Sequence, residues 1–98
     1  MICDFCNADG AITTFDCADH TLLIAIALER ETEHRSIGPW AACADCAGDV
    51  RADNRDALVE RAFTQAGLIV ESEQFSRLLI RTLHAGFFEH RLPGRGGR

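Results

Sequence analysis

Apolar side chains recur every three or four residues between about positions 54 and 66, which predicts an amphipathic α-helix with one buried face. Asp53 or Asn54 can cap its N-terminus, and Gly67 can end it. The residues that follow, 68–70, are expected to form a short apolar connector. The buried face of this helix would consist of Leu58, Val59, Ala62, Phe63 and Ala66.

A longer periodic segment runs from Ser72, a second candidate N-cap, to about His90. Its core-facing stripe is expected to contain Phe75, Leu78, Leu79, Thr82, Leu83 and Gly86. The opposite side of the same helix is also apolar, with Ile80, His84, Phe87 and Phe88. Two hypotheses follow. Either the helix is central and covered on both sides, or the second face is an interface with another copy or a partner protein.

The first half of the chain predicts shorter elements. Residues 11–15, AITTF, form the best strand candidate because they are rich in β-branched and aromatic side chains. Residues 20–34 are ambiguous, since their apolar positions fit both the helical and the strand period. Periodicity alone therefore does not decide whether this segment is a helix or a strand.

Two Cys-x-x-Cys pairs carry the strongest chemical signal. Cys3 and Cys6 begin the chain, and Cys43 and Cys46 follow Gly38-Pro39 in a helix-compatible run. Four thiolates at this spacing can fill a tetrahedral zinc site and leave no open position for substrate water. The second pair is expected in the first turn of a helix, whose N-terminus stabilises thiolates. The sequence thus predicts one structural Zn²⁺ on which folding depends.

Other uses of these cysteines are less well supported. Two disulfides would need an oxidising compartment, which is unsupported because no basic-then-apolar signal segment precedes Cys3. An iron centre of the rubredoxin kind would use the same ligands. The fifth cysteine, Cys17, has no partner pair and is interpreted as a small buried hydrophobe rather than a reactive thiol.

An N-terminal knuckle, a hairpin-like middle and a second pair that opens a helix together resemble the treble-clef zinc fingers, over about residues 1–52. More narrowly, MICDFC and SIGPWAACADC resemble a group of small, largely uncharacterised zinc-finger proteins of actinobacteria and their phages. The resemblance implies a strand for the apolar part of residues 20–34, with 29–35 as a solvated turn or extension. The expected fold is α+β: a treble-clef-like core over 1–52, two further helices over 53–90, and a disordered Arg/Gly tail over 91–98.

The HNH nucleases are also treble clefs, and many carry Asp-His between two Cys-x-x-Cys pairs, as Asp19-His20 does here. In that family the His is the general base, and a carboxylate and a downstream His or Asn hold the catalytic metal. Gly38 and Ala47 stand where the family's Asn and final His or Asn are expected. The missing ligand disfavours a nuclease and leaves His20 as a strand-end or surface residue.

Net charge and the length of the apolar runs argue against nucleic-acid binding and membrane insertion. The net charge is −5, with 15 acidic residues against 10 basic ones, all Arg, and a Zn(Cys)₄ site adds about −2. An acidic protein surface disfavours binding to the phosphate backbones of nucleic acids. The longest apolar run, residues 22–28, is shorter than the roughly 20 residues of a membrane span.

We therefore expect a cytoplasmic, non-enzymatic structural-zinc protein that acts as a protein-interaction or regulatory module. It would bind a protein partner or its own copy through the C-terminal helix, and no membrane. The first alternative is a nucleic-acid-binding, transcriptional zinc protein, and the second is an HNH-like nuclease, active or degenerate.

Overall fold

The fold is α+β, as expected: short antiparallel strands are followed by helices. The computed structural model describes residues 1–27, 30–67 and 72–93, and for residues 22–27 and 30–34 it describes the backbone alone. Within this part of the chain the elements are β1 (Thr13–Phe15), β2 (His20–Ala27), β3 (Arg30–Ser36), β4 (Trp40–Ala42), α1 (Ala44–Arg51), α2 (Arg55–Ala66) and α3 (Glu73–His90).

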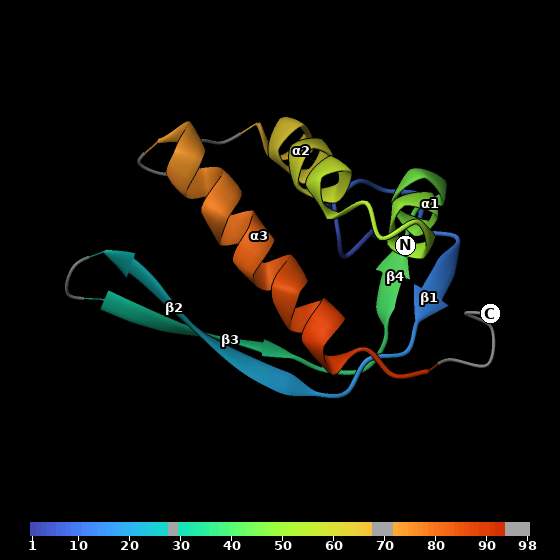
Figure 1. Ribbon diagram of the computed structural model, residues 1–98, viewed down its shortest axis with the longest axis horizontal. Helices are drawn as coiled ribbons and strands as arrows, with labels where there is room; N and C mark the ends of the chain where they lie inside the picture. The colour runs from blue at the N-terminus through green and yellow to red at the C-terminus, as the bar shows by residue number, and fades with distance from the viewer. Residues whose placement is uncertain (28–29, 68–71, 94–98) are drawn as a thin grey trace.

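The strands form two nested antiparallel ladders. β1 pairs with β4, with Phe15 opposite Trp40, and β2 pairs with β3, with His20 opposite Ser36. The inner ladder is the long hairpin that extends away from the rest of the molecule in Figure 1. The strand predicted at 11–15 is confirmed for its last three residues.

The polar segment after the apolar strand is also a strand. We expected a solvated turn or extension over 29–35, but Arg30–Ser36 pairs with β2 along its length. The charged sequence gives little strand signal of its own. Its backbone N–H and C=O groups are instead recruited by the apolar strand that precedes it, because an isolated β2 would leave its own groups unpaired.

Helices α2 and α3 begin at the predicted capping residues, and α2 ends at the predicted glycine. The Asn54 side chain accepts a hydrogen bond from the backbone N–H of Ala57 (3.3 Å), and Gly67 ends α2 in the left-handed conformation, with φ of 61°. The Ser72 hydroxyl accepts the N–H of Phe75 at 3.1 Å and begins α3. The predicted caps are thus confirmed, with Asn54 rather than Asp53 as the first. The connector predicted at 68–70 lies outside the described residues.

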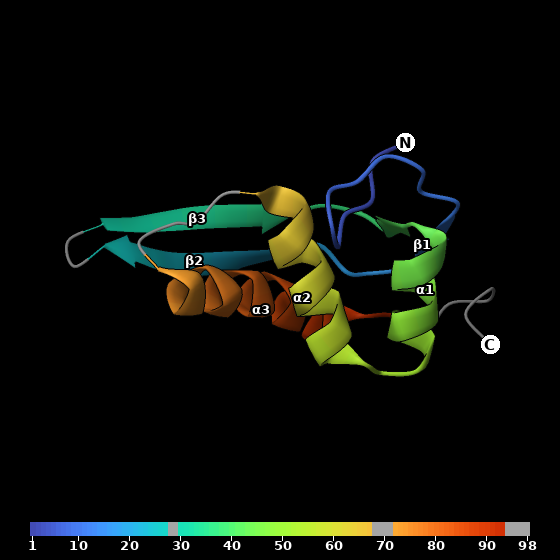
Figure 2. The ribbon, with the colours of Figure 1, turned by 90° about the horizontal axis from the view of Figure 1, so that it is seen from above.

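Helix α3 is central, with the β2–β3 hairpin on one side and α2 on the other (Figures 1 and 2). Phe87 is fully buried and His84 is 4% exposed, while Ile80 and Phe88 pack against the same core. Of the four interface candidates, His84 and Phe87 are thus buried and Ile80 and Phe88 are partly buried against the core of the same chain, which leaves little of them for a partner. This arrangement favours the alternative, in which the helix is central and packed between two other parts of the chain.

The predicted core stripe of α3 is partly turned to solvent. Leu78 is 59% exposed, although its spacing places it with Phe75 and Leu79. The reason is the aromatic cluster that the first half of the chain contributes. The ring centroid of Phe87 lies 4.9 Å from that of Phe5 and 5.2 Å from that of Trp40. Burying these large rings together outweighs burying one leucine, and it sets the rotation of the helix.

Helices α2 and α3 meet partly through charged residues. Arg77 pairs with Glu60 at 2.7 Å, and its guanidinium lies 4.2 Å from the ring centroid of Phe63. Arg81 pairs with Asp56 at 2.8 Å. Phe63, predicted to be buried, is thus only half-buried under an arginine, and the predicted core residue Ala66 is exposed.

The chain after α3 stays attached to the body for at least two residues. Arg91 forms a β-bridge with Cys17, and the N–H of Leu92 donates to the carbonyl of Asp16 at 3.0 Å. The prediction that disorder begins at residue 91 is therefore wrong for Arg91 and Leu92, because the β1–β2 connection offers them unpaired backbone groups. Residues 94–98 lie outside the described part of the chain.

Replacing Phe87 with Ala is expected to lower the free energy of unfolding by about 3–5 kcal/mol, because it removes a ring that is buried on all sides. Leu78→Ala on the same helix is the matched control and should cost less than about 1 kcal/mol, since that side chain is 59% exposed. Urea titration followed by circular dichroism measures both. A larger loss for Leu78→Ala would show that α3 is turned the other way.

Candidate metal centre

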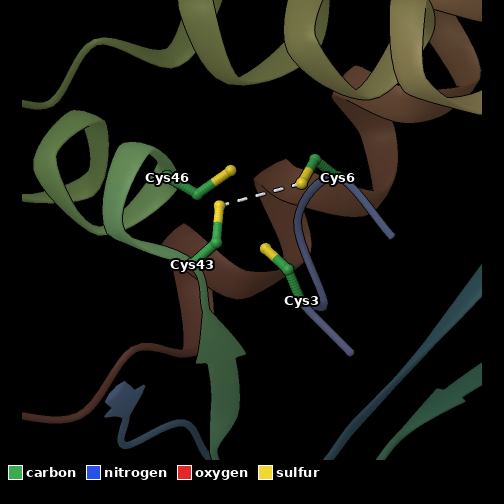
Figure 3. Close-up of side chains that lie close together, drawn as sticks. All are labelled: Cys3, Cys6, Cys43 and Cys46. Atoms are coloured by element: carbon green, nitrogen blue, oxygen red, sulfur yellow. Dashed lines mark hydrogen bonds between the residues drawn. The ribbon is translucent and has the colours of Figure 1, made fainter. Parts of the chain in front are cut away.

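The structure brings the four predicted ligands together. The sulfur atoms of Cys3, Cys6, Cys43 and Cys46 all lie within 4.8 Å of one another and point toward a common centre (Figure 3). The Sγ atoms of Cys6 and Cys43 are 3.9 Å apart. A tetrahedron with metal–sulfur bonds of about 2.3 Å has sulfur–sulfur edges of about 3.8 Å, so this cluster has the size of a tetrathiolate metal site. The four cysteines could therefore bind a metal ion.

Backbone hydrogen bonds fold the first pair into a tight turn. The N–H of Cys3 donates to the carbonyl of Ala8, and the N–H of Asn7 donates to the carbonyl of Cys3, both at 2.8 Å. Asn7 sits in the left-handed region with φ of 67°, which asparagine tolerates better than most residues. The turn directs both sulfurs of the pair to the same side.

The second pair is placed by the junction between β4 and α1. Cys43 is the N-cap of α1, with φ of −71° and ψ of 170°, and its carbonyl accepts the N–H of Ala47. Cys46 lies in the first turn of the helix, as predicted. The positive end of the helix dipole therefore lies beside this pair and favours its thiolate forms.

Asp4 joins the two halves of the site without using the sulfurs. Its backbone N–H donates to the carbonyl of Ala41 at 2.8 Å, and its carboxylate accepts the N–H of Ala41 at 2.6 Å. Since Asp4 stands between the two cysteines of the first pair, this two-way contact holds the turn against β4. The protein itself thus restricts how far the pairs can separate.

The thiols differ in how easily they ionise. Burial opposes ionisation of Cys3, but three surrounding backbone N–H groups outweigh it and lower its pKa to about 7. Burial raises the pKa of Cys6 and, more strongly, that of Cys46. Several thiolates are therefore stable together in this place only when a cation compensates their charge.

Arg61 is part of the site, and sequence analysis missed it. Its Nη1 lies 3.5 Å from the Sγ of Cys46 and 2.6 Å from the Oδ2 of Asp49. Burial works against the charge of the guanidinium, but the neighbouring sulfur and carboxylate outweigh it and raise the pKa of Arg61. The available signal was its position three residues after the buried Leu58, at the edge of the apolar face of α2.

His84 anchors the first cysteine pair to α3. Its Nε2–H donates to the carbonyl of Phe5 at 2.9 Å, and Phe5 lies between Cys3 and Cys6. Burial lowers the pKa of His84, which keeps the ring neutral. This residue, predicted at an interface, instead fixes the turn that carries two of the sulfurs.

Cys17 does not join the metal cluster. It is buried, as predicted, and burial raises the pKa of its thiol. Its Sγ lies 3.9 Å from the Nδ1 of His20. The thiol therefore packs beside a histidine and away from the four clustered sulfurs.

The Asp-His pair between the cysteine motifs has structural contacts. The carboxylate of Asp19 accepts the N–H of Gly38 at 2.7 Å. His20 begins β2, donates through Nδ1–H to the carbonyl of Ala18 at 2.9 Å, and stacks on His90 with centroids 4.3 Å apart. The interpretation of His20 as a strand-end residue is confirmed, but a surface position is wrong, because it is 8% exposed.

Comparison with known proteins finds no match: no protein family, no curated protein and no solved structure is similar to the chain. Within the described residues, no helix combines the length and apolar character that a membrane span requires. The interpretation of the cysteine cluster therefore depends on its geometry.

Arg61→Met should weaken the binding of a thiophilic divalent ion by about tenfold or more, because it removes the cation that faces the sulfur cluster while keeping most of the side-chain volume. Titration with Co²⁺, followed through the sulfur-to-cobalt charge-transfer absorption, measures the affinity. Arg81→Met is the control, since Arg81 pairs with Asp56 on the exposed side of the helices. Equal affinities for both variants would contradict a role of Arg61 at the site.

Proposed function

We propose that the four cysteines hold one structural Zn²⁺ and that the protein is a non-enzymatic module that works by contact with another protein. The observation that carries the proposal is the closed cluster of four sulfurs from two distant segments. Zinc is the usual ion of Cys₄ sites, and four protein ligands leave no position for a substrate or for catalytic water. The ion would therefore stabilise the fold.

The treble-clef resemblance belongs to this proposal. A cysteine turn, the β1–β4 ladder and α1 follow one another in the order of a treble clef, with the β2–β3 hairpin inserted between the strands. The narrower likeness to zinc fingers of actinobacteria and their phages is supported by the Trp that precedes the second pair. Trp40 is buried, and its ring packs against Phe5 inside the first pair, at a centroid distance of 5.0 Å.

One Zn²⁺ per chain is expected after purification without a tag. Cys43→Ala should lose the metal and unfold, because part of the roughly 10–16 kcal/mol of zinc-binding free energy is also folding free energy. Cys17→Ala should keep the metal, since Cys17 lies outside the cluster. Lowering the pH should release the ion, because protons compete with zinc for the thiolates.

Elemental mass spectrometry and circular dichroism test these points. Loss of metal from Cys17→Ala would mean that the ligands are wrongly assigned. Two disulfides with no metal, seen as a loss of four hydrogen masses in the intact protein, would contradict the zinc site altogether. Because thiolate sites persist in reducing surroundings, we also propose a cytoplasmic location.

The nuclease alternative loses support from the surroundings of His20. A general base needs contact with the attacking water, but the Nε2 of His20 is shielded from solvent and has no hydrogen-bond partner among the described residues. The neighbouring Asp19 is engaged with Gly38. Asp19 thus supports the loop between β3 and β4, and His20 stacks on His90, which favours a non-enzymatic role.

The nucleic-acid alternative is weakened by charge. The chain has 15 acidic and 10 basic residues, and several of the arginines are paired with carboxylates, among them Arg61, Arg77 and Arg81. A tetrathiolate zinc site adds about two further negative charges. Little uncompensated positive charge is left for a phosphate backbone, so we favour a protein partner.

We propose that this contact, with a partner or a second copy, uses the solvent side of α3 around Leu78. Leu78→Glu should then abolish self-association or partner capture while metal content and thermal unfolding stay nearly unchanged, because the side chain is 59% exposed. Light scattering of the pure protein and affinity capture from its host measure the two cases. The exposed Ile12→Glu is the control. Association that persists in Leu78→Glu would exclude this surface.

A further inference from the structure

The four clustered cysteines differ in how far they are exposed. Cys3, Cys6 and Cys46 are no more than 2% exposed, whereas Cys43 is partly exposed. Cys43 is also the N-cap of α1, so its sulfur lies beside the positive end of the helix dipole. Oxidants react with the thiolate form of cysteine, and they react fastest where that thiolate is both stabilised and reachable from solvent. Within the cluster, these two conditions meet at Cys43.

The sulfur of Cys6 lies opposite that of Cys43 and belongs to the other cysteine pair. The two Sγ atoms are 3.9 Å apart, and the contact between them is only partly buried (Figure 3). A disulfide bond is about 2.05 Å long, so the two sulfurs need to approach each other by less than one further bond length. Cys6 is therefore within reach of an oxidised Cys43.

Hydrogen-bond donors hold the other two sulfurs more firmly. The Nη1 of Arg61 lies 3.5 Å from the Sγ of Cys46, which is buried in the first turn of α1. Cys3 accepts from three backbone N–H groups, whereas Cys6 accepts from one. Each donor engages a lone pair with which a sulfur would attack another sulfur. Cys6 is thus the freer of the possible partners of Cys43.

We propose that Cys43 is an oxidation site for hydroperoxides, and that its oxidation exchanges the metal ion for a disulfide between Cys43 and Cys6. The inference rests on the proposed zinc site, because the bound ion is what the disulfide replaces. It adds to that site a defined point of attack and a defined product.

The reaction with hydrogen peroxide has two steps. The thiolate of Cys43 attacks one peroxide oxygen, the O–O bond breaks, Cys43 becomes a sulfenic acid and hydroxide leaves. The thiolate of Cys6 then attacks the sulfenic sulfur, the S–S bond forms and a second hydroxide leaves. Two electrons pass from the two sulfurs to the peroxide, which is the only oxidant required.

This disulfide would make the same connection as the ion. It would join the first turn of the chain to the start of α1 across 37 positions of sequence, where the two-way contact of Asp4 with Ala41 already holds the two segments together. Only the thiolates of Cys3 and Cys46 would remain, too few for a closed tetrahedral site. The oxidised protein is therefore expected to release its metal and to keep its fold. A disulfide inside either Cys-x-x-Cys pair would lack this connection.

Peptide mapping distinguishes these products, because the chain has no Lys and trypsin cleaves it only after Arg. The tryptic peptide 1–30 contains the first cysteine pair and Cys17, and the peptide 36–51 contains the second pair. The full-length, metal-loaded protein is treated with hydrogen peroxide in stoichiometric steps, its remaining thiols are alkylated, and it is digested. We expect one cross-linked product of the two peptides, which fragmentation assigns to Cys6 and Cys43. Disulfides within the pairs would leave the two peptides separate.

Three further measurements follow the same reaction. A chromophoric chelator should detect one released Zn²⁺ for each disulfide formed. Circular dichroism should retain its helical signal, and dithiothreitol with added Zn²⁺ should restore the metal-loaded protein. Brief oxidation in the presence of dimedone, which traps sulfenic acids, should label Cys43.

Arg61→Met tests why Cys6 is the partner. The variant removes the donor that holds the sulfur of Cys46, so it should raise the share of a Cys43–Cys46 disulfide about twofold or more. Arg81→Met is the matched control and should leave the products unchanged, since Arg81 pairs with Asp56 away from the cluster. If Arg61→Met does not fold, the peptide map of the wild type still identifies the partner of Cys43.

Three results would overturn the inference: disulfides confined to the two pairs, dimedone on a cysteine other than Cys43, or metal release without a disulfide. Metal content measured before oxidation separates this test from that of the proposed function. A fully loaded protein that gives one of these results contradicts the oxidation site alone. A reduced protein without metal contradicts the zinc proposal, and its peptide map after oxidation still shows whether Cys6 and Cys43 are joined.

Discussion

The convergence of four cysteine sulfur atoms, three of them on buried residues, is the constraint on which the rest of the structure depends. Two of them belong to the first turn of the chain and two to the start of α1, so that Cys6 and Cys43 meet across 37 positions of sequence. Burial raises the pKa of Cys6 and Cys46, which makes the ionised cluster unfavourable without a cation. Closure of this long loop and binding of an ion are therefore parts of one equilibrium.

Phe5 transmits that constraint to the core. Because it lies between two of the sulfur-bearing residues, fixing the turn also fixes its ring, which meets Phe87 edge to face at 4.9 Å. Its carbonyl accepts the hydrogen bond of His84 from the same helix. The metal centre and the hydrophobic core thus share one residue, and α3 takes its rotation from that contact. A small domain gains from such sharing, because its core alone buries little surface.

Local signals could be predicted from the sequence, and contacts between distant segments could not. The caps at Asn54 and Ser72, the stop at Gly67 and the cysteine pairs depend on a few neighbouring residues, so their chemistry is readable directly. Helix α3 has apolar residues on two sides, and no local rule says which side meets the larger partner. The periodicity predicted that Leu78 is buried. In the structure, the side with Phe87 is buried instead, because it packs against the aromatic cluster from the first half of the chain. Arg61 was missed because its sulfur partner, Cys46, lies 15 positions away in the sequence. The polar strand β3 was missed for another reason: its charged sequence gives little strand signal, and it is a strand because the apolar β2 directly before it pairs with it.

A cavity of about 420 Å³ beside the metal centre is lined by the same cysteine turn that carries Cys3 and Cys6. Cys6 lines the cavity with Phe5 and also contributes a sulfur to the cluster, while His84 lines it and holds the carbonyl of Phe5. Any ligand that fixes the Phe5 ring therefore stabilises the arrangement of the turn that places the sulfurs. By linkage, an ion in the cluster must favour that ligand to the same extent as the ligand favours the ion. The rigidity of the turn sets the size of this coupling free energy. If the contacts of Asp4 with Ala41 already hold the turn in place, the coupling is small. If the ion is needed to order the turn, the cavity wall forms only when the metal is bound.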